Sequence, residues 1–446
     1  MNRLLLSSTV VAALGGLLFG FDTAVISGTT EALRQVFHLT SSQLGFTVAS
    51  ALIGTIIGSI AVGRPAEQIG RKWTLMVMGM FFFVSAVGCG FAWDWISLLA
   101  FRFIGGIAIG GASVVSPMYI AEIAPPHARG RLVSVSQFNT VLGILMAYFT
   151  NYLIAGIFSA QPGEGALVAW RWMFGVEALP ALLFCLFLLQ IPESPRWLVK
   201  RHRRLEALAT LKRLGNRDAE QLLNEIVDSL HEETVRVTEP FFIRKYRTPI
   251  LLAIMVATFN QLSGINAVIY YTADIFRMAG AEQASALFQS VIIGVTCLAS
   301  TVVAMPVIDR FGRKNLLLTG AAGMAACLAV TAYAFYNSIG GRLVLASLMG
   351  YIAFFAFSQG AVIWVFLSEI FPNRVRARGQ SLGSFTHWTW CAIVSWTFPV
   401  IAEQSGGHAF SFFGIMMVLQ FVMVWKILPE TKGVSLEQIQ RTLGIE

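Results

Sequence analysis

Three ionisable residues lie in stretches of the sequence that are otherwise almost entirely apolar. They are Arg102, within residues 97–121, and two acids, Asp22 and Glu177. A full charge in the hydrocarbon core of a membrane costs at least a few kcal/mol, so an ionisable residue there is a candidate for function. Carboxyl groups beside a guanidinium can bind and release a proton. The three residues therefore predict a proton-coupled transporter.

The composition places these residues in a protein that crosses the membrane many times. Of the 446 residues, 56% are hydrophobic and only 13% are charged, whereas a soluble domain carries about 25% charged residues. The mean hydropathy is +0.68. A membrane-spanning helix needs roughly 20 apolar residues. Twelve stretches qualify: 8–28, 45–63, 73–93, 97–121, 132–156, 170–191, 248–272, 285–308, 315–336, 342–368, 380–402 and 408–428.

The basic residues are distributed unevenly between the two sides of this arrangement. If the N-terminus is cytoplasmic, all but five of the 32 Lys and Arg residues fall in the N-terminal tail, the inner loops or the C-terminal tail; the exceptions are Arg34, Arg171, Arg277, Arg342 and the intramembrane Arg102. This is the positive-inside pattern. It places both termini in the cytoplasm and explains the net charge of +8 without a nucleic-acid partner.

The depths of the three ionisable residues can be estimated from the rise of an α-helix. Arg102 and Glu177 lie about seven residues from the outer ends of their spans, or roughly 10 Å deep, and Asp22 lies roughly 9 Å deep. All three therefore fall in one layer. Burial favours the neutral form of Asp22 and a nearby Arg102 favours its charged form, which gives a pair with two states. The alternative is that Arg102 extends to the outer surface and Asp22 only caps a helix break.

The two halves of the chain repeat each other. Residues 122–130, E-I-A-P-P-H-A-R-G, correspond to 369–376, E-I-F-P-N-R-V-R; likewise Gly70-Arg71-Lys72 corresponds to Gly312-Arg313-Lys314, and Glu67 to Asp309. The repeat predicts an all-α membrane protein with two pseudo-symmetric six-helix bundles and a cavity between them, suited to alternating access. The expected domains are an N-terminal bundle at 1–191, an intracellular helical linker at 192–247 and a C-terminal bundle with a short tail at 248–446.

The linker is expected to form short amphipathic helices at the inner surface. One stripe consists of Leu205, Leu208, Leu211 and Leu214, and a second of Leu222, Leu223, Ile226 and Leu230. A segment of this length cannot bury an independent catalytic core. No phosphate-binding loop, metal-ligand spacing or nucleophile motif occurs, and the five cysteines form no pairing or metal pattern. We therefore expect no enzyme activity and no cofactor apart from the coupling proton.

Four motifs resemble those of the sugar porter family of the major facilitator superfamily, over nearly the whole length of the chain. They are G-G-L-L-F-G-F-D-T-A-V-I-S-G (15–28), P-E-S-P-R-W-L (192–198), N-Q-L-S-G-I-N-A-V-I-Y-Y (260–271) and P-E-T-K-G (429–433). The resemblance, which extends to bacterial sugar–proton symporters and facilitative glucose transporters, implies twelve helices and a central monosaccharide pocket.

The resemblance also implies the coupling site. In proton-coupled sugar porters an aspartate at the position of Asp22 and an arginine at that of Arg102 form the coupling pair. An acid matching Glu177 occurs in the bacterial xylose–proton symporter. Facilitative animal glucose carriers have Asn in place of Asp22.

A further implication is an ion-pair network that closes the cytoplasmic side. Its expected members are charged residues of the repeated loops and of the P-E-S-P-R motif, with Glu122 and Glu369 beside Arg129 and Arg376. The full set is Glu122, Arg129, Glu369, Arg376, Arg71, Arg313, Glu193 and Arg196. Glu67-Gln68 stands where the family usually has Asp-Arg, and we expect this to weaken the network of the first half.

The sugar pocket matches the family less closely. Residues that match known sugar contacts are Gln137, Gln261, Asn266, Tyr270 and Trp364. Asn260 replaces a Gln, and His387, just before Trp388, replaces a Gln or Asn; Cys297 and Ile144 stand where relatives have amides, and Ala361 where a Pro usually follows Gly360. We expect a stiffer tenth span and an altered pattern of hydroxyl recognition, with Trp388 either in the pocket or packed beside it.

The predicted function is symport of a monosaccharide, either a hexose or a pentose, with a proton by alternating access. An uncoupled facilitator with the same pocket is an alternative that Asp22 opposes. A sugar sensor is a second alternative, opposed by the tail of about 17 residues after Pro429. The expected partners are the sugar, protons and the lipid bilayer, with no obligate protein partner. The expected protein is a monomer in the bacterial inner membrane.

Overall fold

The computed structural model is built almost entirely of helices. It describes residues 2–125, 128–159, 165–216, 218–235, 240–304, 311–372, 374–432, 438 and 445. Within these residues, eleven helices or helix pairs are long and apolar enough to cross a membrane. The remaining predicted span, 380–402, lies in the 29-residue helix α21 (Arg376–Gln404), which is less apolar because it contains residues such as His387 and Arg378. The predicted all-helical membrane fold is confirmed.

Contacts divide the chain into two compact units. Unit 1 comprises 1–23, 50–147 and 170–237, and unit 2 comprises 24–49, 148–169 and 238–446. Unit 1 contains most of α1 (Arg3–Val25), part of α3 (Ser41–Ala61), α4 (Gly63–Gln68), α5 (Arg71–Gly90), α6 (Trp95–Ile123), most of α7 (Arg129–Ser159), part of α8 (Gly165–Gly175), α9 (Ala178–Leu188), α10 (Pro195–Lys200), α11 (Arg204–Arg213) and α12 (Ala219–Val235).

Unit 2 contains the second half of the chain and two short pieces of the first half, 24–49 and 148–169. Its helices are α2 (Thr30–Phe37), α13 (Arg247–Leu262), α14 (Ile265–Tyr270), α15 (Thr272–Met278), α16 (Gln283–Ala304), α18 (Arg313–Tyr336), α19 (Arg342–Phe357), α20 (Gln359–Glu369), α21 and α22 (Gly406–Ile427). The pieces are held by specific bonds: the Tyr148 hydroxyl donates to Ile269 O at 2.7 Å, and Ser27 Oγ accepts the Ala273 N–H at 3.1 Å. The division by contacts differs from the sequence repeat, so the predicted halves remain a prediction.

Three of the predicted spans are interrupted, and in the tenth span Gly360 was expected to mark a break before Trp364. The predicted 170–191 span breaks between α8 and α9 at Glu177, 248–272 breaks between α13 and α14, and 342–368 breaks between α19 and α20. Gly264 accounts for the second break because its φ of +85° is accessible to glycine and strained for other residues. Each break lies beside a predicted functional residue.

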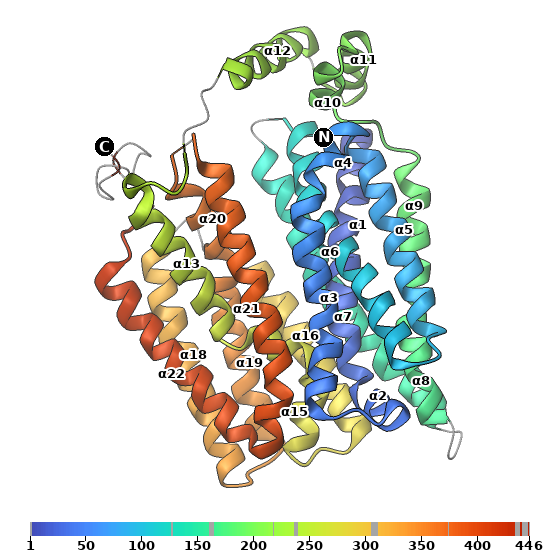
Figure 1. The fold of residues 1–446 in the computed structure, drawn as a ribbon, viewed down its shortest axis with the longest axis vertical. Helices are drawn as coiled ribbons and strands as arrows, with labels where there is room; N and C mark the ends of the chain where they lie inside the picture. Colours follow the sequence, from blue (N-terminus) through green and yellow to red (C-terminus); the bar gives the residue numbers. More distant parts are fainter. Residues whose placement is uncertain are drawn as a thin grey trace. The chain divides into compact units, whose positions relative to one another are not determined.

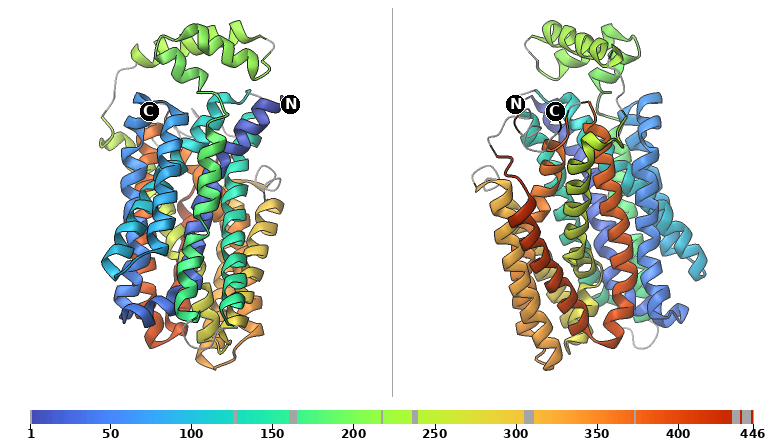
Figure 2. Two further views of the ribbon diagram at one scale, coloured as in Figure 1. Left: turned by 90° about the vertical axis from the view of Figure 1, so that its right-hand side faces the viewer. Right: turned by 60° about the vertical axis from the view of Figure 1, so that its left-hand side comes forward.

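The linker helices form a small layer of their own at one end of unit 1. α10, α11 and α12 lie beyond the ends of the long helices in all views (Figures 1 and 2). Their core includes Trp197, Leu211 and Leu223. We expected Leu205 to lie on the buried stripe of α11, but its side chain is 83% exposed. The buried stripe of this helix runs instead through Ala207 and Leu211, which are one helical turn apart.

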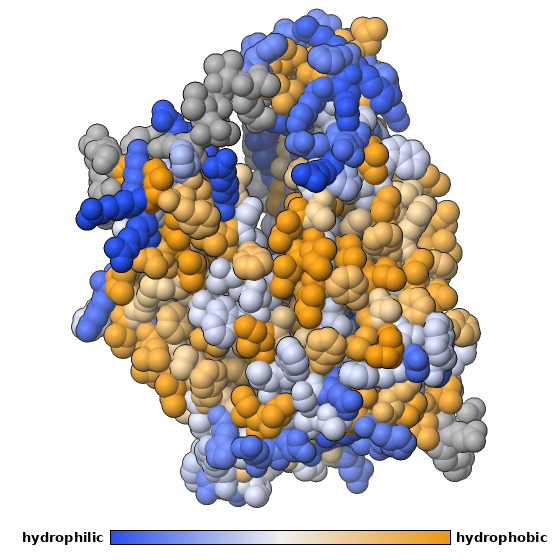
Figure 3. Space-filling model, viewed as in Figure 1, coloured by the Kyte–Doolittle hydropathy of each residue, from blue (hydrophilic) through white to orange (hydrophobic). Residues whose placement is uncertain are grey.

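The surface of the helices is suited to lipid. Hydrophobic residues cover the middle of the helices in each unit, and hydrophilic residues gather near their ends (Figure 3). Large exposed side chains such as Leu186, Phe288 and Trp425 belong to this belt. In water such a surface would drive aggregation, whereas in a bilayer it faces hydrocarbon.

Candidate functional site

Asp22 on α1 and Arg102 on α6 form a buried ion pair in unit 1. Arg102 Nη1 donates to Asp22 Oδ1 and, at 3.5 Å, to the backbone oxygen of Asp22. Asp22 is 2% exposed and Arg102 is 1% exposed. The guanidinium also lies over the ring of Phe174 on α8, 5.6 Å from its centroid. A buried pair of opposite charges avoids most of the cost that either charge would have alone.

The second carboxyl oxygen of Asp22, Oδ2, is buried but does not bond to Arg102. Among the described residues, Asp22 Oδ2 has no hydrogen-bond partner, and it faces Gly105, where an added Cβ would lie 2.8 Å from this oxygen and 2.4 Å from Ser85 Oγ. A proton can therefore add to Oδ2 while Oδ1 still faces Arg102. Sequence reasoning did not identify Ser85 or Gly105, since neither residue type signals proton chemistry by itself.

Glu177 is the third member of the predicted coupling site. It precedes α9 at the break from α8, is 3% exposed, and its Oε1 has no partner within the described part of the chain. The charges of Asp22 and Arg102 both act on it. The structure thus brings together the three residues that the depth estimate placed in one layer.

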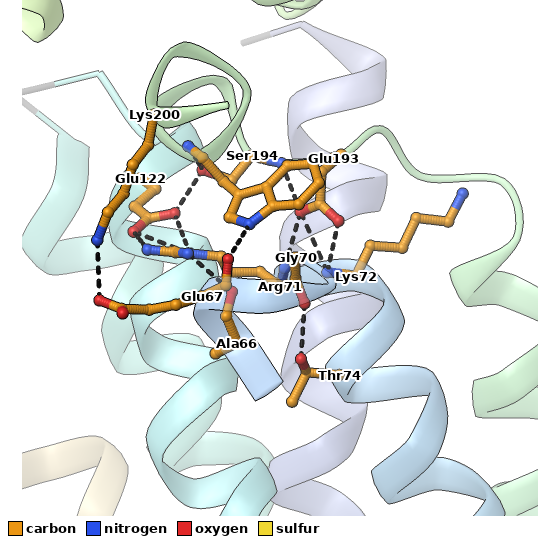
Figure 4. A network of polar contacts seen from close by, with 11 residues as sticks. Ala66, Glu67, Gly70, Arg71, Lys72, Thr74, Glu122, Glu193, Ser194 and Lys200 are labelled. Atoms are coloured by element: carbon orange, nitrogen blue, oxygen red, sulfur yellow. Dashed lines mark hydrogen bonds and ion pairs between the residues drawn. The ribbon is translucent and has the colours of Figure 1, made fainter. Parts of the chain in front are cut away.

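A network of charged residues lies at the end of unit 1 that carries α10 (Figure 4). Arg71, at the start of α5, makes a bidentate ion pair with Glu122 at the end of α6, with distances of 2.8 and 2.9 Å. Ser194 donates its hydroxyl proton to Glu122. Glu193 accepts the backbone N–H groups of Arg71 and Lys72 at 3.0 and 3.2 Å. A carboxylate at a helix N-terminus is favoured by the helix dipole and satisfies its free N–H groups.

Unit 2 repeats this network with equivalent residues. Arg313 Nη2 contacts Glu369 at 3.1 Å, Thr431 Oγ1 donates to Glu369 at 2.6 Å, and Glu430 accepts the Arg313 N–H at 2.9 Å and the Lys314 N–H at 3.1 Å. Our sequence reasoning missed Glu430, Thr431 and Ser194 as members. The signal was present, because Pro-Glu-Thr at 429–431 repeats Pro-Glu-Ser at 192–194.

Glycines precede the helix in both networks for the same reason. Gly70 and Gly312 have φ values of +97° and +82°. A Cβ at Gly70 would lie 2.3 Å from Glu193 Oε2, and one at Gly312 would lie 2.7 Å from Glu430 Oε2. The backbone can therefore approach each carboxylate only without a side chain.

The remaining predicted members of the network lie elsewhere. The expected network joined Glu122 and Glu369 with four arginines, and the structure pairs the two glutamates with Arg71 and Arg313. Arg129 is exposed and makes no ion pair with another described residue. Arg376 Nε donates to the backbone oxygen of Phe371 at 3.4 Å. Arg196 lies in the first turn of α10.

Glu67 lies beside the first network and contacts α10. Its carboxylate contacts Lys200 at 2.9 Å, and its backbone oxygen accepts from Trp197 Nε1 at 2.8 Å, so it ties α4 to α10. The Arg71–Glu122 pair is bidentate, whereas the described contacts of Arg313 with Glu369 comprise one bond. Asp309, the counterpart of Glu67, lies outside the described residues.

The two glutamates at the helix N-termini should respond differently to pH. Burial raises the pKa of Glu193. At Glu430 burial also opposes the charge, but backbone N–H groups, including those of Lys432 and Arg313, outweigh it and lower the pKa. A lowered pKa in the folded state stabilises the protein above the unfolded pKa of about 4.3, and this stabilisation is lost as the pH falls through the folded value; a raised pKa has the opposite sign.

We therefore expect Glu430→Gln to lower the melting temperature at pH 7 by about 2 °C, with a difference that shrinks as the pH falls below about 4. Glu193→Gln should leave the melting temperature at pH 7 unchanged or slightly raised. Thermal unfolding of both variants in detergent between about pH 3 and pH 8 checks this. Equal losses at pH 7 in the two variants would contradict the assigned difference.

Four polar side chains predicted to bind sugar lie together in unit 2. Gln261 Nε2 lies 3.1 Å from both Asn260 Oδ1 and His387 Nε2, and Gln261 Oε1 accepts from Asn266 Nδ2 at 2.7 Å. Three of the four are buried, and Asn266 is half-buried. The cluster offers amide donors and acceptors close to an aromatic surface, since the Trp364 ring lies 5.1 Å from the His387 ring. This is the combination that carbohydrate recognition requires.

The other predicted pocket residues differ in exposure. Trp364 is 40% exposed, whereas Tyr270 and Trp388 are 3% and 8% exposed, and the Trp388 ring packs on that of His387. Gln137 lies on α7 in unit 1 with an exposed side chain. Cys297 is half-buried on α16.

An ion-pair cluster in unit 2 was not identified from the sequence. Arg277 on α15 contacts Glu31 on α2 at 2.9 Å and also Asp274. These residues, with Tyr271 and Phe398, line a cavity of about 660 Å³. The pairing joins residues more than 200 positions apart, which composition and spacing do not reveal.

Comparison with known proteins relates the chain to one family. Residues 8–443 match the family described as sugar (and other) transporter. The D-xylose–proton symporter of Escherichia coli K12 is 40% identical, covering 97% of this chain and 94% of its own length. The arabinose–proton symporter of Bacillus subtilis is 36% identical over 96% of this chain and 93% of its own length. Among solved structures, an inward-open conformation of the Escherichia coli xylose transporter is 39% identical, with a TM-score of 0.87 over 98% of this chain and 99% of that one.

Proposed function

Because this chain belongs to the sugar (and other) transporter family, we propose that it carries a pentose, D-xylose in the first place, across the membrane together with a proton. The chain is a proton-coupled sugar symporter with the major facilitator fold, as its sequence predicts. The pentose is favoured because the relative named for D-xylose is 40% identical, whereas relatives named for glucose are 34–36% identical over a similar share of the chain. The observation that carries the mechanism is the buried Asp22–Arg102 pair, in which one carboxyl oxygen is open.

The proposed roles follow from the charges in this pair. Deprotonated Asp22 neutralises Arg102, and protonated Asp22 no longer holds it by charge, so proton binding changes how strongly α1 and α6 attract each other. Glu177 lies within the influence of both charges and acts as a second carboxyl in the proton pathway. The networks around Arg71 and Arg313 close the cytoplasmic side, and their release accompanies opening.

The sugar pocket is assigned to the polar cluster around Gln261. Asn260, Gln261, Asn266 and His387 supply hydrogen bonds, and Trp364 supplies an aromatic surface for the C–H face of the ring. Gln137, Tyr270 and Trp388 complete the proposed set.

The topology of the protein is proposed from the distribution of its charges. Both termini are cytoplasmic, residues 1–191 and 248–446 are the two halves that rock against each other, and 192–247 joins them on the cytoplasmic side. The protein acts as a monomer in a bacterial inner membrane.

Transport into proteoliposomes that contain a pH-sensitive dye tests this function. A panel of pentoses, hexoses and inositol is added outside, one sugar at a time. Acidification of the lumen with D-xylose or another pentose supports the proposal and identifies the substrate. Sugar uptake without acidification would make the protein a facilitator, and acidification with hexoses alone would exclude the pentose assignment.

His387 should determine sugar preference. Its ring nitrogens lie 3.1 and 3.2 Å from Gln261 Nε2, so His387→Ala removes both a pocket wall and a partner of the central amide. We expect the ratio of D-xylose to D-glucose uptake to change by about tenfold, with little loss of protein. Competition assays check this, with His408→Ala, an exposed histidine at the start of α22, as the matched control. An unchanged competition profile would remove His387 from the pocket.

A further inference from the structure

The break between α19 and α20 is held by side chains rather than by proline. Ser358 interrupts the helix with φ −116° and ψ −90°. Its hydroxyl donates to the Phe354 oxygen at 2.6 Å, which satisfies a carbonyl that the break would otherwise leave free. Sharp kinks need an identifiable cause, and no proline occurs between 342 and 371. The residues next to the break must therefore fix its geometry.

Gln359, the first residue of α20, is fastened to α22 by a buried amide pair. Its Nε2 donates to Gln420 Oε1 at 2.5 Å and lies 3.4 Å from Met417 Sδ. Gln359 is 1% exposed and Gln420 is 2% exposed. Buried amides are unfavourable unless they are hydrogen-bonded, and two of them between apolar helices add directional restraint that apolar packing lacks.

The same residue touches the proposed sugar pocket through its backbone. Asn260 Nδ2 lies 3.4 Å from Gln359 O, and Asn260 Oδ1 accepts from Gln261. Trp364 follows Gln359 by five residues on the short helix α20. Any rotation of the break would therefore move the Asn260 contact and Trp364 together.

We propose that Gln359 and Gln420 form an amide clamp that fixes the α19–α20 break against α22, and that Gln420 is thereby a positioning residue for the sugar pocket. Gln359 Oε1 has no hydrogen-bond partner within the described residues. The side chain of Gln359 can therefore leave Gln420 without breaking further hydrogen bonds at this oxygen. The proposal depends on the proposed function only where it concerns the effect of the clamp on sugar binding.

Hydrogen–deuterium exchange of the sugar-free protein tests the clamp itself. In Gln420→Leu, exchange of the amides at 354–366 should be about fivefold faster than in the wild type, the size of one lost hydrogen bond. Gln359→Leu should raise the exchange rate by the same factor, because it removes the same hydrogen bond. Gln404→Leu, at an exposed position near the end of α21, is the matched control. Unchanged exchange in Gln420→Leu would overturn the proposal.

Uptake of D-xylose into proteoliposomes tests the positioning role. Gln420→Leu should raise KM by about fivefold with Vmax per folded protein retained, and Gln359→Leu/Gln420→Leu should raise it no further than either single change. A lower Vmax with unchanged KM would indicate a merely structural residue and overturn the role. Failure of the wild type to take up D-xylose would contradict the proposed substrate and not the clamp, which the exchange rates support or overturn independently.

Discussion

Replacement of Asp22 with asparagine is expected to abolish sugar-driven acidification while sugar exchange remains measurable. Asparagine keeps the size of the side chain and an oxygen for Arg102, but it cannot take up a proton. If the proton travels on Asp22, the acidification rate should fall by about tenfold or more, to the background leak. Exchange of labelled sugar across the membrane requires no net movement of protons, so it reports whether the pocket and the conformational change survive.

Asp22→Asn leaves the charge of Arg102 without a counter-ion, so loss of folding must be distinguished from loss of proton coupling. Arg102 is 1% exposed, and a buried charge without its counter-ion destabilises a protein by about 3–5 kcal/mol. The melting temperature of Asp22→Asn shows whether the protein still folds. Asp22→Glu restores a carboxylate beside Arg102 and serves as the comparison for proton coupling. Acidification that persists in a folded Asp22→Asn protein would move the proton to another carboxyl, and Glu177 would be the next candidate.

The proximity of Asp22 and Arg102 was predictable because helix geometry is nearly constant. A fixed rise per residue converts position along a span into depth, and Asp22 and Arg102 indeed lie in contact. The choice of partners was less predictable. Glu122 is close in sequence to Arg129, but Arg71 reaches it from 51 residues away with a bidentate contact, because partner choice depends on which guanidinium the fold buries beside the carboxylate.

The helix breaks illustrate what an average over a span conceals. Hydropathy summed over about 20 residues identifies 248–272 and 342–368 as apolar, whatever their local backbone. Gly264 was a local signal for the first break, since its positive φ is one that glycine adopts readily. The signal for the second break was Gly360, which lies two residues after Ser358 and was expected to mark a break before Trp364. The Gln359–Gln420 contact beside this break gave no signal, because it joins two helices that are distant in sequence.

The position of Asp22 depends on how closely α1 approaches its neighbours. Gly20 lies two residues before Asp22, and a Cβ added to it would lie 1.8 Å from Thr140 O on α7. On the opposite side, a Cβ at Gly15 would lie 2.6 Å from Ser116 Oγ on α6, the helix that carries Arg102. Small residues let membrane helices pack backbone against backbone. The glycines of the 15–28 motif therefore place the carboxyl beside the guanidinium.

Gly20→Ala adds a single methyl group, and we expect it to destabilise the protein more than any other glycine-to-alanine change in this region. Because the obstacle is backbone rather than a flexible side chain, α1 must move away from α7, and overpacking of this kind costs about 1–3 kcal/mol or more. We expect a marked loss of folded protein, measured by size-exclusion chromatography and thermal unfolding, and loss of acidification in whatever protein remains. Gly156→Ala on α7, with nothing within 4 Å of the added Cβ, is the matched control, and alanine should stabilise the helix there by roughly 0.5–1 kcal/mol. If Gly20→Ala were as stable and as well coupled as Gly156→Ala, close packing of α1 on α7 would not be what places Asp22.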